Sequence, residues 1–251
     1  MLVRLTHRAG GFEGAASSLR TRREHRLWHA SPVSALRNGR ARGASDEAGV
    51  RLERLQFRRA SHGDAEAVAA LHADSWRRHY RGAYSDAFLD GDVLADRLVV
   101  WSERVAESDR GRCTILAELD GHLAGFAHVV FEEDAMWGAL LDNMHVASAL
   151  KRRGIGSSLL ALTGRAVTER PRGDGLYLWV LEQNVAARAF YEACGGSFAG
   201  RARVSPPGGI AGRLVGSPAK LRYAWRDPAV LLAAVEPTKR SAGAQRARDG
   251  T

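Results

Sequence analysis

The chain has 251 residues, of which 45% are hydrophobic, and it carries a formal net charge of +9. These values are typical of a globular protein with one large or two small domains, and no apolar run approaches the roughly 18–20 residues that a membrane-spanning helix requires. The two cysteines, Cys113 and Cys194, are too few for a disulfide framework and do not form a C-x-x-C pair, so we expect a reducing, cytoplasmic setting without a metal centre.

The positive charge is concentrated at the two ends of the chain. Residues 1–50 contribute +5 and residues 237–251 contribute +3, which leaves +1 for residues 51–236. Residues 1–50 have neither a helical nor a strand period and few large apolar side chains, so burial cannot offset their ordering entropy. We therefore predict a disordered basic N-terminal arm over 1–50, a folded domain over 51–236 and a disordered C-terminal tail over 237–251. A transit-like peptide and an upstream extension absent from the mature protein are alternative interpretations of the arm.

Hydrophobic periodicity and turn residues predict the elements of the folded domain. In the first half they are a strand over Leu52–Arg59, a helix over Ala65–Tyr80 capped by Asp64, and a second helix capped by Ser85, broken near Gly91 and continuing to about Val105. The second half holds strands over Cys113–Leu119, His122–Phe131, Leu140–Val146, Tyr177–Leu181, Ser197–Val204 and Lys220–Trp225, and helices over Ile155–Thr168, Val185–Ala193 and Asp227–Val235. This order of strands and helices indicates an α+β domain rather than a doubly wound one.

A Gly-rich turn between a strand and a helix is the first candidate site. It reads Lys151-Arg152-Arg153-Gly154-Ile155-Gly156-Ser157. The first amides of a helix have no internal partner and the helix dipole adds positive charge there, while glycines let the backbone approach a phosphate. The spacing matches neither the Walker pattern nor the three-glycine dinucleotide motif. Taken alone, the turn is interpreted either as a pyrophosphate cradle or as a plain basic helix start.

A second motif lies about 30 residues downstream and makes the pattern specific. It consists of Asn184, Ala187, Phe190 and Tyr191, with Phe198 opening the next strand. Together the two motifs resemble those of the GCN5-related N-acetyltransferase (GNAT) superfamily, [Q/R]-x-x-G-x-[G/A] and N-x-x-A-x-x-F-Y, over roughly residues 52–225. The chain departs from the first motif in having Lys151 in place of Gln or Arg, and Arg152 where Gly is frequent.

The resemblance implies a mixed, mostly antiparallel central sheet with helices on both faces, and acetyl-CoA as the co-substrate. It implies that the backbone of Met144 and Val146 binds the pantetheine arm, that amides of the turn bind the pyrophosphate, and that Asn184 contacts the arm. The cofactor-binding residues expected on this basis are Met144, His145, Val146, Lys151, Arg152, Arg153, Gly154, Ile155, Gly156, Ser157 and Asn184.

Acetyl transfer to an amine needs a group that protonates the leaving thiolate and a group that takes a proton from the amine. A phenol can act as the general acid, and the resemblance places Tyr191 near the sulfur. Strand alternation predicts that Leu140, Asp142, Met144 and Val146 share one face, with His145 on the opposite face as a structural side chain. Asp142 is therefore the candidate general base, although a salt-bridged carboxylate and a base acting through water remain alternative interpretations.

The amine acceptor is expected between the first two helices and the loop of about residues 205–217. Trp76 and Tyr80 share a helical face and are the candidate substrate-binding residues, with core packing as the alternative for Trp76. The acceptor is a small molecule or a peptide amine; neither a membrane nor a nucleic acid is expected as a partner, and a homodimer is left open. The alternative functions are transfer of a longer acyl group, an inactive acyl-CoA-binding sensor or scaffold, and nucleic-acid binding through the basic arm.

Overall fold

The computed structural model describes residues 55–106, 111–172 and 175–233. The predicted basic arm and C-terminal tail lie outside these residues. One mixed sheet of seven strands forms the centre of the molecule, in the order β1-β2-β3-β4-β5-β7-β6. The strands are β1 (Leu55–Arg59), β2 (Arg112–Leu119), β3 (His122–Asp134), β4 (Gly138–Val146), β5 (Leu176–Leu181), β6 (Ser197–Arg203) and β7 (Ala219–Trp225). The pairing of β4 with β5 is parallel, and the other five pairings are antiparallel.

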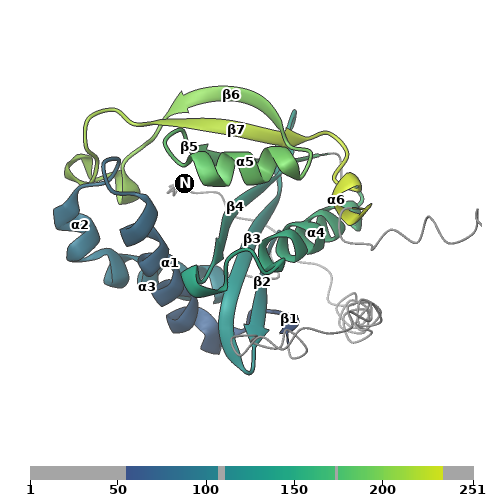
Figure 1. Ribbon diagram of the computed structural model, residues 1–251, viewed down its shortest axis with the longest axis horizontal. Coiled ribbons are helices and arrows are strands. Elements are labelled where there is room, and N and C mark those ends of the chain that lie inside the picture. The colour runs from purple at the N-terminus through teal and green to yellow at the C-terminus, as the bar shows by residue number, and fades with distance from the viewer. Residues whose placement is uncertain (1–54, 107–110, 173–174, 234–251) are drawn as a thin grey trace, which may run out of the picture.

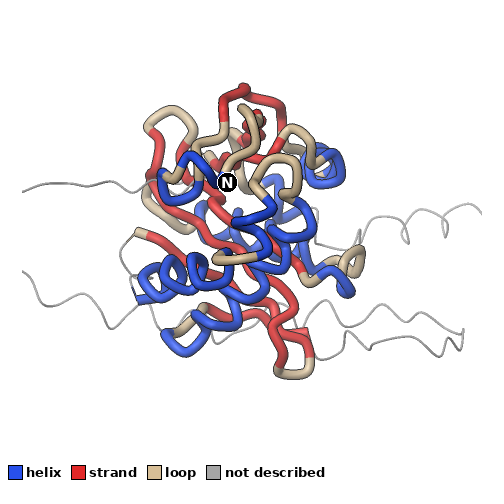
Figure 2. The backbone as a smooth tube through the Cα atoms, turned by 90° about the vertical axis from the view of Figure 1, so that its left-hand side faces the viewer, coloured by secondary structure: helices blue, strands red, loops and turns tan. Residues whose placement is uncertain are grey.

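Helices cover both faces of this sheet, as the resemblance implied. They are α1 (Ala65–His79), α2 (Asp86–Asp90), α3 (Val93–Ala106), α4 (Ile155–Thr168), α5 (Val185–Ala193) and α6 (Val230–Ala233). In Figure 1, α1, α2 and α3 gather at the left, α4 and α6 lie at the right, and β6 and β7 cross the top. Figure 2 views the molecule from the side of α1–α3. Within the described ranges, no helix is long and apolar enough to cross a membrane.

Alternation along the strands separates two hydrophobic layers. Ile115 and Ala117 of β2 belong to the cluster that includes Leu159 of α4, whereas Leu116 packs with Trp101 of α3 on the opposite face. This period of two is what a strand buried on both sides requires. The face that contacts α4 and α5 is here called the α4 face, and the face that contacts α1 and α3 is called the α1 face.

Most predicted elements are confirmed, and the two helices that flank the motifs begin and end at the predicted residues. Gly91 ends α2 and lies before α3. Only glycine fits at this position, because a Cβ would lie 2.7 Å from the carbonyl oxygen of Ala87. The predicted capping by Asp64 is wrong: its carboxylate accepts hydrogen bonds from the Ser61 amide at 2.6 Å and from Arg58 at 2.7 Å, and not from α1. The side chain of Ser85 likewise makes no capping hydrogen bond to α2.

A β-bulge at Asp142 overturns the predicted alternation along β4. Asn143 pairs with His128 and Leu141 pairs with Val129, so Asp142 is an extra residue between two ladder positions. The bulge shifts the parity of every later residue. Met144 and Val146 consequently join Leu141 on the α4 face, and Asp142 and His145 share the α1 face, contacting α3 and α1.

Candidate active site

The parallel pair β4 and β5 separates soon after it begins. The two strands are paired at Ala139–Leu176 and Leu140–Tyr177 and at no later position of either strand, both of which the structure describes in full. Beyond this point the β5 side of β4 lacks a strand partner, while its other side remains paired with β3 through Met144 and Val146. Because extended backbone offers hydrogen-bonding groups along each edge, the gap between β4 and β5 can accept an extended amide-containing chain.

The Gly-rich turn lies at the end of β4 and leads into α4. Gly154 precedes the helix with φ 80°, a left-handed conformation that glycine adopts without strain. Arg152 adopts φ 62° without being glycine, which explains why this position is frequently Gly in the motif that it resembles. The first intrahelical bond runs from the Ser158 amide to the Gly154 carbonyl at 3.0 Å, so the amides of residues 155–157 are the first-turn donors.

Lys151, the first cation of the turn, is held by α1. Its Nζ lies 2.6 Å from Nε2 of His79, the last residue of that helix. Burial lowers the pKa of His79, and the charge of Lys151 lowers it further. The pKa of Lys151 is also lowered, first by burial and then by the charge of Arg78. Both shifts favour a neutral His79 that accepts a hydrogen bond from the lysine.

The second motif forms α5, and two of its side chains have structural roles in capping and packing this helix. The side chain of Asn184 caps the helix by accepting a hydrogen bond from the Ala187 amide at 3.2 Å. Phe190 packs near Gly156, whose added Cβ would lie 3.5 Å from the Phe190 ring, so the two motifs contact each other. Capping of α5 is thus one reason for an asparagine at position 184. The contact with a cofactor arm, which the resemblance implied, is a second and separate role.

Tyr191 lies on the buried side of α5 and is 8% exposed. Its ring contacts Phe190, with 5.2 Å between ring centroids, and Trp225, with 6.2 Å. Burial raises the pKa of its phenol well above the ordinary value, and the nearby Tyr80 adds to this shift. The hydroxyl therefore stays protonated at neutral pH, which is the form that a general acid needs.

The predicted base, Asp142, lies on the α1 face and is 4% exposed. Its carboxylate lies 2.6 Å from Nη2 of Arg104 and accepts a hydrogen bond from Asn143 at 3.0 Å. Both the ion pair and the hydrogen bond hold the carboxylate against neighbouring side chains. The position of Asp142 thus favours the alternative of a salt-bridged carboxylate over the general base.

His145 contacts α1 from β4, and it shares the face of Asp142 instead of lying on the opposite face as predicted. Its Nδ1 lies 2.7 Å from the Ser75 hydroxyl, and its ring lies 4.6 Å from the ring of His72. Burial lowers the pKa of His145 to about 3. The side chain therefore stays neutral and positions the strand whose backbone borders the gap.

The two predicted substrate-binding residues differ in their surroundings. Trp76 is fully buried, stacks on Tyr80 with ring centroids 5.3 Å apart, and carries the Arg97 guanidinium 4.2 Å above its ring. Its side chain thus packs the core, which was the alternative interpretation. Tyr80 is 8% exposed, and burial followed by the charge of Asp142 raises its pKa to about 12. Of the two side chains, only that of Tyr80 is slightly exposed to solvent.

Sequence reasoning missed the residues that support this region from other elements. Arg104 pairs with Asp142, Ser75 contacts His145, and His72 accepts a hydrogen bond from Trp101 Nε1 at 2.9 Å. Ser75 and His72 fall on the apolar face of α1, and polar residues on such a face are the signal that could have found them.

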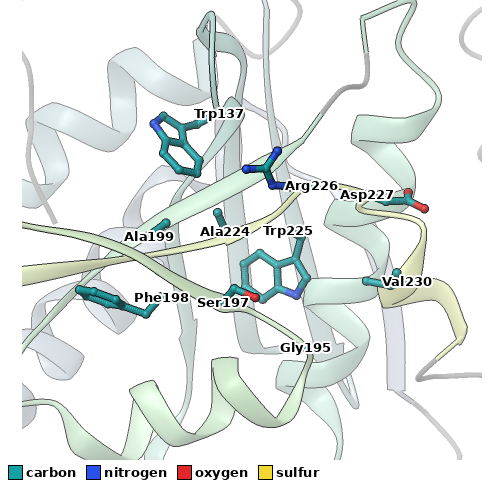
Figure 3. Close-up of a pocket in the computed structure, with 10 residues that line it drawn as sticks. All are labelled: Trp137, Gly195, Ser197, Phe198, Ala199, Ala224, Trp225, Arg226, Asp227 and Val230. Atoms are coloured by element: carbon teal, nitrogen blue, oxygen red, sulfur yellow. The ribbon is translucent and has the colours of Figure 1, made fainter.

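A hollow of about 420 Å³ lies elsewhere, where β6 begins and β7 ends. Figure 3 shows its lining: Trp137, Gly195, Ser197, Phe198, Ala199, Ala224, Trp225, Arg226, Asp227 and Val230. None of the predicted site residues belongs to this lining.

Comparisons with known proteins agree with this geometry. A probable N-acetyltransferase of Mycobacterium tuberculosis is 31% identical over 142 residues, which are 55% of this chain and 77% of that protein. The fold is similar to that of the PaiA N-acetyltransferase of Thermoplasma acidophilum, solved in complex with coenzyme A, with a TM-score of 0.53 and 19% identity over 68% of this chain and 99% of that one. An N-acetyltransferase of Staphylococcus aureus matches with a TM-score of 0.50 and 16% identity, covering 68% of this chain and 98% of that one. Residues 67–196 match the Acetyltransferase (GNAT) family, and the chain belongs to this family.

Proposed function

We propose that this protein transfers the acetyl group of acetyl-CoA to a primary amine of a small molecule or peptide, with Tyr191 as the general acid. The separation of β4 from β5 carries this proposal, because β4 leads from the gap to the first-turn amides of α4, and β5 leads from it to α5, the helix that carries Tyr191. Family membership and the coenzyme A complex of the Thermoplasma relative support it independently.

The residues around the gap fit the chemical parts of acetyl-CoA. The pantetheine arm carries amides, which suit the β5 side of β4 at Met144 and Val146. The pyrophosphate suits the amides of residues 155–157, because they point out of a helix N-terminus that Lys151, Arg152 and Arg153 flank. Acetyl-CoA supplies the thioester, and the chain supplies an extended edge, an anion-binding turn and a phenol.

In the proposed reaction the unprotonated amine attacks the thioester carbon. A new N–C bond forms, the C–S bond breaks, the thiolate takes the Tyr191 proton, and the amine nitrogen loses its proton to water. Negative charge develops on the carbonyl oxygen, and an amide on the free edge of β4 near Val146 would donate a hydrogen bond to it. We do not assign the proton acceptor to Asp142, because Arg104 pairs with its carboxylate.

Two measurements test the proposal. Calorimetric titration of the full chain with acetyl-CoA is expected to show saturable binding, and thiol release across a panel of amines is expected to identify an acceptor. A folded protein that does not bind acetyl-CoA would contradict the proposal. Binding without turnover of any amine would favour the sensor or scaffold interpretation.

A further inference from the structure

Two cations and three aromatic rings share the α1 face of the sheet beyond β4. They are Trp137, Tyr177, Trp179, Lys220 and Arg222, and they are here called the cation–aromatic face. Residues alternating with them in β5 and β7, among them Leu178 and Leu221, belong to the core on the α4 face. The strand register therefore places these side chains on the side of the sheet where the acceptor is expected.

Arg222 is the centre of this face. Its guanidinium lies 4.5 Å from the ring centroid of Trp179, 4.8 Å from that of Trp137 and 5.4 Å from that of Tyr177. Its Nε is buried and has no hydrogen-bond partner in the part of the chain that the structure describes. Aromatic rings fix the position of the cation without neutralising its charge, since they supply no carboxylate. The aromatic rings thus fix the Arg222 guanidinium in place, and its Nε–H donor has no acceptor among the described residues.

A second cation reinforces the positive potential at the same place. Lys220 precedes Arg222 by two residues on β7, and its Nζ lies 4.4 Å from the ring centroid of Trp179. Within the described ranges, no ion pair joins a carboxylate to Arg222, whereas three other carboxylates are paired with arginines. These pairs are Asp142 with Arg104, Glu182 with Arg201, and Asp96 with both Arg97 and Arg213. Arg222 is therefore a cation of this face without a carboxylate partner among the described residues.

The cation–aromatic face adjoins the gap. Trp179 and Arg222 are cross-strand partners, and β5 is the strand that separates from β4 directly after Tyr177. β5 alone separates β7 from the gap, and neighbouring strands lie about 4.8 Å apart, so a group bound at Arg222 would be on the order of 10 Å from a reacting centre in the gap. This distance suits an acceptor whose amine and anionic group belong to one small molecule.

We propose that the cation–aromatic face recognises an oxyanion group, a carboxylate or a phosphate, on the amine that this enzyme acetylates. The inference rests on the proposed acetyl transfer and names its substrate class. Arg222 would bind the oxyanion through paired N–H donors, Lys220 would add charge, and the rings of Trp137 and Trp179 would exclude water from these contacts. Polycationic amines are expected to be poor acceptors on this surface, because the guanidinium of Arg222 repels them.

The test measures matched pairs of acceptors with the full-length protein. Each amino acid is compared with its carboxamide, and O-phosphoethanolamine is compared with ethanolamine, by thiol release and by calorimetric binding in the presence of coenzyme A. At least one oxyanion member is expected to exceed its neutral partner by tenfold or more in kcat/KM or in affinity. A preference confined to carboxylates or to the phosphate identifies which oxyanion the face accepts.

Variants of Arg222 separate recognition from folding. Arg222→Gln is expected to raise KM for the preferred acceptor by about 10–100-fold, to leave kcat within about twofold, and to leave acetyl-CoA affinity unchanged. Arg222→Lys keeps the charge and is expected to restore part of the preference. Arg172→Gln makes the same charge change at an exposed position after α4 and is the matched control, expected to behave as the unaltered protein.

Three results would overturn the inference. They are the absence of a preference in every pair, including the absence of binding to both members; an unchanged preference in Arg222→Gln; and a higher kcat/KM for spermidine than for every oxyanion-bearing amine. A failure of acetyl-CoA to bind would instead contradict the proposed function, and the calorimetric comparison of the pairs would still decide the oxyanion site.

Discussion

Nζ of Lys151 lies 2.6 Å from Nε2 of His79, and this contact joins the end of α1 to the turn that precedes α4. An ammonium group only donates hydrogen bonds, so His79 must accept with an unprotonated nitrogen. We predict that His79→Ala raises the Kd for acetyl-CoA by about 2–10-fold, because Lys151 loses the partner that positions it. His79→Gln retains an acceptor oxygen and is the control. Equal Kd values for the protein and both variants, measured by calorimetry, would show that the contact does not position the turn.

Tyr191→Phe removes the proposed general acid and keeps the ring. We predict that kcat falls by about 10²–10³-fold while the Kd for acetyl-CoA changes little, because a single proton-transfer group typically contributes this range. Steady-state thiol release and calorimetry measure the two quantities. Tyr223→Phe is a suitable comparison. Tyr223 lies on β7, its ring centroid is 6.4 Å from that of Tyr191, and its hydroxyl donates a hydrogen bond to Glu192. A normal kcat in Tyr191→Phe would reject the acid assignment.

Gly154→Glu is predicted to abolish binding of acetyl-CoA. The substitution forces an L residue into the left-handed backbone conformation with φ 80°, and it places a negative charge beside the amides proposed to bind the phosphates. Gly154→Ala imposes the same conformational strain without the charge, and we expect it to retain measurable but weaker binding. Native-like affinity in Gly154→Glu, by calorimetry, would mean that the phosphates bind elsewhere.

Asp142 and Arg104 are predicted to stabilise the fold rather than to transfer protons. Asp142→Asn leaves Arg104 without its carboxylate in a site where Asp142 is 4% exposed, so the free energy of unfolding should fall by about 3–5 kcal/mol. At a temperature where the variant is folded, the acidic limb of its kcat/KM profile should match that of the unaltered protein. Denaturant unfolding and a pH–rate profile check these two statements, and loss of the acidic limb would return Asp142 to the role of base.

Acid should destabilise this protein through its buried histidines. Burial lowers the pKa of His72 and His128 well below 6.5, so the unfolded state binds more protons than the folded state once the pH falls below that value. The contribution of these two histidines to the free energy of unfolding is therefore present above about pH 6.5. It is lost as the pH falls below that value, by about 1.4 kcal/mol for each histidine and each pH unit. Urea unfolding at pH 7.5 and 5.5 measures the loss.

His128→Gln isolates one of these contributions. The glutamine can still bond to Thr114, whose hydroxyl lies 2.8 Å from Nδ1 of His128. The loss of stability between pH 7.5 and 5.5 should shrink by about 1.4 kcal/mol in this variant. His122→Gln, at the exposed first residue of β3, is the matched control and should leave the loss unchanged. Equal losses in both variants would contradict the assignment to buried histidines.

Local signals in the sequence determined the elements that flank the motifs. Helices α4 and α5 begin and end where capping residues, glycines and Pro171 predicted, because these signals act within a few residues of the helix ends. The same local chemistry identified the turn at Gly154 and the helix that carries Tyr191. The resemblance to a family added their roles, which backbone propensity alone does not contain.

Only the tertiary structure decided which side chains meet. The bulge at Asp142 arises from the pairing of β4 with β3, and one extra residue moved Asp142 and His145 to the same face. The ion pair with Arg104 and the assembly of Trp137, Trp179 and Arg222 likewise depend on contacts between elements distant in the chain. Alternation predicts a face only while the register is regular, and register is set by pairing between strands that a single sequence does not specify.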